Sequence, residues 1–230
     1  MRGRGHRAAL VAIGLAVVAG LVALGVWQLQ RRSWKLALIA QVQARLAAAP
    51  VPAPGPAAWP AIDRTDAYRR LSLDGRYRPQ GSVRVQAVTD LGAGWWVLTP
   101  FDTDRGFTVL VNRGFIPADM AMPAPPAGPQ RIGGLLRVTE PGGAFLRSND
   151  PAHARWYSRD VAAIAAAQRL GAVAPYFVDA DRRSGPGWPR GGLTVVAFSN
   201  NHLVYALTWF GMAALLTGAL VHLARRRDPA

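Results

Sequence analysis

Two long apolar runs, one near each end of the sequence, constrain the fold more than any other feature. The first extends from Ala8 to Trp27 without a charge, and the second extends from Leu203 to Ala224, interrupted only by His222. A helix of about 20 apolar residues spans the hydrocarbon core of a bilayer. The sequence therefore predicts transmembrane helices at residues 8–27 and 202–224.

Each run has an alternative interpretation: a cleaved signal peptide for the first and a buried soluble helix for the second. The first run is longer than the apolar region of a typical signal peptide, no A-x-A cleavage site follows it, and Arg31 and Arg32 close it. The second run is apolar on all sides and ends at the basic sequence ARRR. These features favour membrane spans for both.

The formal net charge of +14 comes partly from basic residues that flank the two runs. By the positive-inside rule, the arginines of the tails 1–7 and 225–230 place both ends in the cytoplasm. The bias toward alanine and arginine, with almost no lysine, suggests a GC-rich bacterial genome. For a bacterial protein this topology predicts location in the inner membrane, with the central domain in the periplasm. The remaining positive charge is scattered, with no basic run beside stacking aromatics, so membrane lipids are expected partners and nucleic acid is not.

Composition divides the region between the spans into three parts. Residues 28–49 lack Gly and Pro and are predicted to extend the first helix, whereas residues 50–60 read as a Pro-rich, mobile linker. Residues 61–201 contain short segments of alternating apolar and polar side chains, which is typical of half-buried strands. The predicted fold class is an α+β membrane protein, in which a hairpin of two transmembrane helices flanks a mostly antiparallel β-barrel or sandwich with one or two helices.

Local signals place the elements within this domain. Asp160 is predicted to cap a helix that ends at Gly171. Two pairs of aspartates, Asp102 with Asp104 and Asp179 with Asp181, lie in turn-like contexts and are expected in solvated loops. The predicted strands cover residues 70–77, 82–88, 94–117 as a hairpin, 132–140, 144–147, 174–181 and 193–198.

The chain contains few residues that could carry chemistry. It has no cysteine, which excludes disulfides, thiolate zinc sites and C-x-x-C-H haem attachment. It contains no nucleophile elbow, Walker loop, zinc-protease or dinucleotide-binding motif, so it is not expected to be an enzyme and no catalytic residue is assigned. Of its histidines, His6 and His222 are expected on the cytoplasmic side and His153 in a surface loop, which leaves His202.

His202 stands at the outer end of the second span and is a candidate axial ligand of haem iron, a role for which one imidazole suffices. Tyr205 and Trp209 follow at i+3 and i+7 and are expected on the same helix face, against which a flat macrocycle can lie. The alternative is structural. Tyr and Trp are common at membrane interfaces, and a histidine preceded by two asparagines can simply begin a helix.

Basic residues also lie at the outer end of the first span, against the positive-inside rule. Arg31, Arg32 and Lys35 are candidates for pairing with the propionates of a haem, although a solvated helix turn explains them equally well. Trp27 and Trp34 recur at helical spacing on this segment. They are expected either to pack on the same ring or to anchor the helix at the headgroups.

Five segments of the chain resemble the surfeit locus protein one family, the Shy-type assembly factors of cytochrome c oxidase. They are GVWQLQRRSWK, AYRRLSLDGRY, GWWVLTPF, VLVNRGFIP and NNHLVYALTWFGMAAL, in the order of the family. The resemblance implies a two-span membrane protein whose domain lies in the periplasm or intermembrane space. It also implies a role in supplying haem a to oxidase subunit I. A histidine of the NNHL motif is linked to haem binding in bacterial members, and His202 holds that position here.

The residues and the resemblance together predict an assembly factor that binds haem a transiently and helps insert it into cytochrome c oxidase subunit I. Subunit I and haem a synthase are the expected protein partners. The alternative is a cofactor-free membrane scaffold that stabilises an oxidase subunit intermediate, for which Gly211, Ala214 and Gly218 would allow close helix packing. The loop Asp150–Trp156 departs from the family pattern, and its role stays open.

Overall fold

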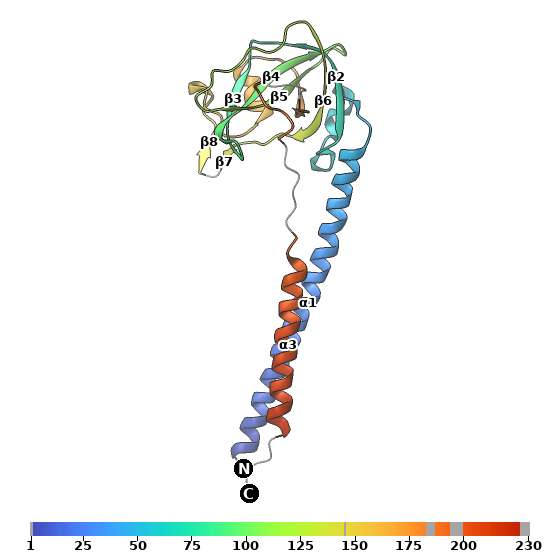
Figure 1. The fold of residues 1–230 in the computed structure, drawn as a ribbon, viewed down its shortest axis with the longest axis vertical. Coiled ribbons are helices and arrows are strands. Elements are labelled where there is room, and N and C mark those ends of the chain that lie inside the picture. The colour runs from blue at the N-terminus through green and yellow to red at the C-terminus, as the bar shows by residue number, and fades with distance from the viewer. Residues whose placement is uncertain (1, 145, 183–186, 194–199, 226–230) are drawn as a thin grey trace. The chain divides into compact units, whose positions relative to one another are not determined.

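The computed structural model describes residues 2–144, 146–182, 187–193 and 200–225 (Figure 1). The chain forms two compact units, one built from α1 (Arg2–Ala47) up to residue 43 together with α3 (His202–Arg225), and one built from residues 44–195. Most of the strand expected at 193–198 lies outside the described residues.

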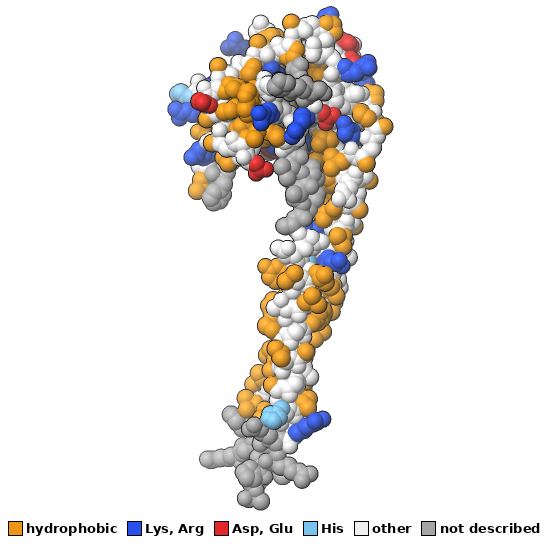
Figure 2. All heavy atoms as spheres, in the orientation of Figure 1, with side chains coloured by type: hydrophobic (Ala, Val, Ile, Leu, Met, Phe, Trp, Pro, Cys, Tyr) orange, Lys and Arg blue, Asp and Glu red, His pale blue; other side chains and the backbone are white. Residues whose placement is uncertain are grey.

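Both long helices expose apolar side chains along their length. Ile13 of α1 is 63% exposed and Leu215 of α3 is 78% exposed, whereas a core helix of a soluble protein would bury such side chains. Figure 2 shows hydrophobic side chains along the visible face of both helices. Among the described residues, these are the two helices long and apolar enough to cross a membrane. Helix α1 continues without a break to Ala47 and ends before Pro50, as the absence of Gly and Pro predicts.

Contacts between α1 and α3 show that the two helices lie antiparallel. A side chain at Gly25 would meet the ring of Phe210 at 2.5 Å, and one at Gly14 would meet Leu220 at 2.5 Å. The order of these contacts runs oppositely along the two helices. Glycine on α1 therefore lets larger side chains of α3 approach its backbone, as small residues do in membrane helix pairs.

The second unit is a seven-stranded sheet in the order β1-β2-β6-β9-β5-β4-β3, closed by an additional pairing of β2 with β4. The closed ring is barrel-like and mostly antiparallel, with β5 and β9 parallel. Strand β3 lies outside this ring and pairs with β4, and β1 pairs with β2 in parallel. The strands are β1 (Val51–Pro52), β2 (Arg70–Tyr77), β3 (Val83–Thr89), β4 (Gly92–Thr103), β5 (Thr108–Pro117), β6 (Pro129–Val138) and β9 (Val173–Ala180).

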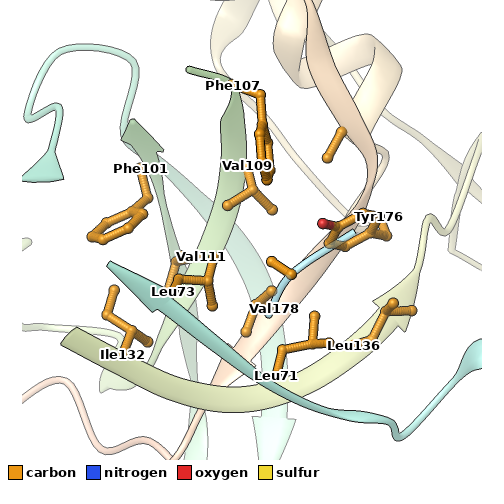
Figure 3. Packing of buried hydrophobic residues seen from close by; sticks show 12 residues of the cluster. Leu71, Leu73, Phe101, Phe107, Val109, Val111, Ile132, Leu136, Tyr176 and Val178 are labelled. Carbon is orange, nitrogen blue, oxygen red and sulfur yellow. The ribbon is translucent and has the colours of Figure 1, made fainter. Parts of the chain in front are cut away.

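Successive side chains along each strand point to opposite faces of this sheet, and apolar side chains form a core on both faces. One set of side chains points into the barrel and forms a core, which Figure 3 shows with Phe101, Val111, Leu136 and Tyr176 converging. A second core lies outside the ring, where α2 (Val161–Ala167) and Trp156 cover β3, β4, β5 and β9. Because β5 lies between these two cores, nearly all of its residues are buried.

Two expectations for smaller elements are wrong in detail. Residues 144–147 were expected as one strand, but Ala144 and Arg147 belong to different two-residue strands, β7 (Gly143–Ala144) and β8 (Arg147–Ser148), which pair antiparallel. Asp160 caps α2 as predicted, since its side chain accepts a hydrogen bond from the backbone N–H of Ala163. The helix nevertheless ends at Ala167, four residues before Gly171, because Arg169 already takes a left-handed conformation with φ of 53°.

The Pro-rich stretch 50–60 is part of the barrel domain and not a mobile linker. Ala53 is 3% exposed within the barrel core, and residues 56–61 form a 3-10 helix (η1, Pro56–Ala61). The carbonyl of Pro54 accepts hydrogen bonds from the hydroxyl of Tyr176 at 2.7 Å and from the indole N–H of Trp59 at 3.1 Å. Arg105 donates to the carbonyl of Ala53 at 2.6 Å. These bonds fix the stretch to the domain despite its proline content.

The α1–α3 contact gives a first prediction. Gly25→Leu should push the helices apart because its side chain would occupy the space of the Phe210 ring. Gly14→Cys and Leu220→Cys are introduced together into this cysteine-free chain, and oxidation should then form a disulfide between the helices. The yield of this disulfide is measured on non-reducing gels after proteolysis of the barrel domain. Gly25→Leu should lower that yield several-fold. Gly218→Leu is the matched control, since nothing lies within 4 Å of a side chain there. Equal yields from both leucine variants would contradict this contact.

Tyr176 gives a second prediction, for alkaline pH. Burial raises the pKa of its hydroxyl because the charged phenolate is poorly solvated there. The neutral form therefore stabilises the fold below about pH 10, and this contribution is lost as the pH rises above that value. Tyr176→Phe should cost about 0.5–1.5 kcal/mol at neutral pH, because Trp59 still satisfies the Pro54 carbonyl.

The measurement is the denaturant midpoint of the full chain in detergent at about pH 7 and about pH 10.5. The phenylalanine variant should lose less stability between the two pH values than the wild type does. Tyr157→Phe, at a half-exposed tyrosine, is the control. An unchanged alkaline loss in the Tyr176 variant would show that another group causes it.

Candidate functional site

His202 is the first residue of α3 and is held by a side chain of α1. Its ring Nδ1 lies 2.7 Å from Oε1 of Gln28. A carbonyl oxygen can only accept a hydrogen bond, so Nδ1–H donates to Gln28, and in the neutral ring the lone pair is then on Nε2. No other hydrogen bond to this ring occurs among the described residues. The geometry fixes both the tautomer and the orientation of the imidazole.

On α1, the basic residues near Gln28 differ in burial. Arg32 and Lys35 follow Gln28 at i+4 and i+7, so they lie on the face that carries Gln28, and both are half-buried. Arg31 is exposed, and its guanidinium lies 4.7 Å from the ring centroid of Trp34. The structure therefore associates Arg32 and Lys35 with the Gln28 face, whereas Arg31 stacks on an exposed tryptophan.

The four predicted aromatic residues lie in different environments. On α3, Trp209 is half-buried on the side of His202, whereas Tyr205 is 55% exposed. On α1, Trp27 is 50% exposed and Trp34 is 56% exposed. With about 100° of rotation per helix residue, Trp27 and Trp34 lie roughly a quarter turn or more away from Gln28. Trp209 is thus the aromatic residue closest in orientation to the His202 face.

Gln28 is the residue that the sequence-based reasoning missed. It lies 174 positions from His202, and no local spacing links the two. The helix-period pattern of α1 nevertheless contains a signal, since Gly25, Gln28, Arg32 and Lys35 share one face that is less apolar than the rest. A polar amide on the packed side of a membrane-type helix requires a partner, and His202 is that partner here.

The described residues contain no group of three or more His, Cys, Asp or Glu side chains that could hold a metal ion. His153 lies at the surface as predicted, although it ends a short 3-10 helix (η3, Pro151–His153); it is 71% exposed and its Nδ1 lies 2.7 Å from Asp150. The hydrogen bond to His153 is the main cause of the lowered pKa of Asp150. The arrangement around His202 can therefore provide one imidazole ligand but not a multidentate metal site.

Small residues on α3 lie on two sides of the helix, one buried and one exposed. Ala206 is fully buried and Ala213 is 5% exposed on the side that faces α1. Gly211, Ala214 and Gly218 are exposed, and side chains built at the two glycines would meet nothing within 4 Å. The small residues expected to serve a scaffold therefore do not pack against α1.

Of the carboxylates predicted in solvated loops, Asp104 is exposed in the turn between β4 and β5, whereas Asp102 and Asp179 lie in strands. Asp179 lies in β9, is 6% exposed, and accepts hydrogen bonds from Asn112 at 2.8 Å and from Arg137 at 3.0 Å. Arg159 pairs with Glu140 at 2.6 Å; burial lowers its pKa, but this pairing and the charge of Asp179 raise it overall. Asp102 lies in β4, where Arg78 pairs with both of its oxygens. These groups are structural ion pairs of the barrel.

The barrel, the His202–Gln28 pair and most of α1, together with the first half of α3, lie within a match to a known family. The sequence model of the SURF1 family matches residues 15–214. The chain belongs to the SURF1 family. Members of this family are known as cytochrome c oxidase assembly factors and are not named as enzymes.

Similarity to individual members extends over most of the chain. Surfeit locus protein 1 of Mus musculus is 36% identical over 237 residues, which cover 94% of this chain and 76% of the mouse protein. The Homo sapiens protein of the same name is 37% identical, over 83% of this chain and 69% of the human protein. A SURF1-like protein of Monosiga brevicollis is 32% identical, over 92% of this chain and 86% of its own length. The family assignment therefore applies to the helices as well as to the barrel.

Proposed function

We propose that this SURF1-family chain is a membrane-bound assembly factor that binds haem a through His202 and helps deliver it to cytochrome c oxidase subunit I. The observation that carries the proposal is the hydrogen bond from His202 to Gln28. It holds the imidazole in the tautomer whose Nε2 can bind iron. Haem a is the cargo in this proposal, and the protein contributes no redox chemistry of its own.

The residues around His202 fit such a cargo. An acceptor on Nδ1–H increases the basicity of Nε2 as a ligand, which is the usual outer-shell role at a haem or zinc histidine. Arg32 and Lys35 lie on the Gln28 face and supply positive charge for two propionates, and Trp209 supplies an apolar aromatic surface. Arg31, Trp27, Trp34 and Tyr205 are more exposed and play a lesser part. A single imidazole ligand without a covalent link suits binding that must later be reversed.

The proposed topology follows from the charges that flank the helices. With α1 and α3 as a transmembrane hairpin in a bacterial inner membrane, both tails lie in the cytoplasm and the barrel domain lies in the periplasm. His202 and Gln28 are then at the periplasmic membrane surface. Haem a synthase and subunit I are both membrane partners from which haem could be received and to which it could be passed.

A second candidate function is a scaffold that binds no cofactor. The observation that favours it is the exposed small-residue face of α3, formed by Gly211, Ala214 and Gly218. Such a face lets a helix of an oxidase subunit approach closely. A wild-type protein that carries no haem when purified from cells that make haem a would favour this candidate.

The ligand assignment predicts that His202→Ala loses most of the bound haem. The variant and the wild type are co-expressed with the haem a synthesis enzymes, purified in mild detergent, and compared by Soret absorbance per mole of protein. His222→Ala is the matched control, because it removes a histidine near the other end of α3. Imidazole added to His202→Gly should restore part of the Soret band. Haem content equal to the wild type in His202→Ala would refute the assignment.

The outer-shell role predicts a smaller loss for Gln28→Leu. Without the acceptor, Nδ1–H is unpaired and the ring is free to rotate, so haem affinity should fall by about tenfold. Haem release to excess apomyoglobin provides the measurement. Gln30→Leu, an exposed position on the same helix, should release haem at the wild-type rate. If Gln28→Leu and Gln30→Leu behave alike, Gln28 has no role in holding the ligand.

A further inference from the structure

A pocket of about 220 Å³ on the barrel domain has a positively charged lining. Asp150 lies outside this lining; its carboxylate is bonded to His153 and interacts electrostatically with Arg155. Three guanidinium groups line it, those of Arg84, Arg147 and Arg155, and its lining contains no Asp or Glu. Among the described residues, none of the three forms an ion pair. We name it the arginine pocket; its other lining side chains used below are Gln86, Trp95 and Tyr157.

Other arginines of the same domain are paired. Arg70 pairs with Asp181 at 2.7 Å, Arg78 with Asp102 at 2.6 Å, and Arg131 with Asp74 at 2.6 Å. Arg137 and Arg159 belong to the buried ion pairs around Asp179. Against this background, three unpaired guanidiniums that converge on one pocket indicate a place for an external anion.

Aromatic side chains hold two of the guanidiniums in place. Arg84 lies 5.1 Å from the ring centroid of Trp95, and Arg147 lies 5.5 Å from that of Tyr157. Arg147 also donates a hydrogen bond to Oε1 of Gln86 at 3.0 Å. Stacking on a ring restrains a guanidinium but leaves most of its N–H donors free to bind a carboxylate in a bidentate manner.

The loop that supplies Arg155 and Tyr157 is rigidly attached to the barrel. The side-chain oxygen of Asn149 accepts the backbone N–H of Tyr157 at 2.8 Å. The backbone carbonyl of Trp156 accepts the N–H of Gln86 at 2.8 Å, which fixes the loop to β3. A pocket whose walls are already ordered loses little conformational entropy on binding.

Exposed apolar side chains beside the pocket identify the class of its ligand. Val88 is 82% exposed and lies on the same face of β3 as Arg84 and Gln86, and Leu146, which precedes Arg147, is 88% exposed. A small anion would use only the guanidiniums. Charged, aromatic and aliphatic groups together form the composition of a protein interface, in which Arg, Trp and Tyr carry most of the binding energy.

We propose that the arginine pocket binds an acidic segment of a protein partner, whose carboxylates contact Arg84, Arg147 and Arg155 while its apolar side chains contact Val88 and Leu146. This inference concerns recognition of a partner chain and is independent of haem binding by His202. The pocket combines a lining of arginines without carboxylates, ordered walls and an apolar margin.

The probe is a peptide with fluorescein on its N-terminus, fluoresceinyl-Gly-Glu-Leu-Asp-Glu-Leu-Gly-amide. It is titrated against the full chain in phosphatidylcholine nanodiscs and followed by fluorescence anisotropy. The double variant Arg147→Gln/Arg155→Gln should weaken binding by at least about tenfold, because carboxylates lose their bidentate partners. The control Arg64→Gln/Arg131→Gln removes the same net charge outside the pocket and should leave the affinity within about twofold of the wild type. A peptide with Gln and Asn in place of Glu and Asp should bind at least about tenfold more weakly.

Further arms of the experiment test the alternatives. Equal weakening by both double variants would show a response to net charge alone and would overturn the proposal, as would no weakening by either. Arg155→Glu, at an exposed position without a side-chain bond to lose, should also weaken binding of the acidic peptide. Dispersed short-chain phosphatidylglycerol is added as a competitor. If it displaces the labelled peptide as effectively as unlabelled peptide does, the pocket binds lipid or free anions instead. No arm uses haem, so a failure of the haem proposal leaves this result interpretable.

Discussion

The close approach of α1 and α3 is the contact on which the candidate site depends. Gly25 has no side chain, so the ring of Phe210 lies against the backbone of α1. This spacing brings Gln28, about one turn further along α1, within hydrogen-bonding distance of His202 at the start of α3. Both side chains are partly buried, so a hydrogen-bond partner on the opposite helix satisfies an imidazole N–H and an amide oxygen that water reaches only in part. Helix packing and ligand orientation are thus one feature of the same pair of helices.

Local patterns in the sequence predicted much of the fold because they depend on neighbouring residues alone. Alternation of apolar and polar side chains gave β2 at its observed bounds, Arg70–Tyr77, and Asp160 was identified as a helix cap. The errors share a physical cause, which is pairing between distant segments. Asp179 was expected in solvent, but Asn112 and Arg137 from other strands satisfy it in the interior. The stretch at Ala53 was expected to be mobile, but Tyr176 and Arg105 bind its carbonyls.

The candidate site shows the same limit. His202 was identified from the sequence because a histidine beside a long apolar run is uncommon and conspicuous. Gln28 was missed, since only the packing of two helices relates it to His202. The arginines were the hardest to distinguish. The sequence alone does not distinguish Arg159, which forms a buried ion pair, from Arg31, which stacks on Trp34, or from Arg155, which lines the arginine pocket. Their roles depend on which carboxylates the fold brings near them.

Delivery of a cofactor requires two kinds of recognition, and the two units of this chain are suited to different ones. A cargo that must be released is best held by few bonds, and one imidazole oriented by Gln28 meets that condition. Weak holding alone would release the cargo anywhere, so specificity has to come from contact with the receiving chain. Unpaired guanidiniums on an ordered surface provide such contact through charge complementarity, which speeds association and selects the partner more than it increases affinity. In the proposed function, ligand strength and partner selection can therefore change independently, because they belong to separate parts of the protein.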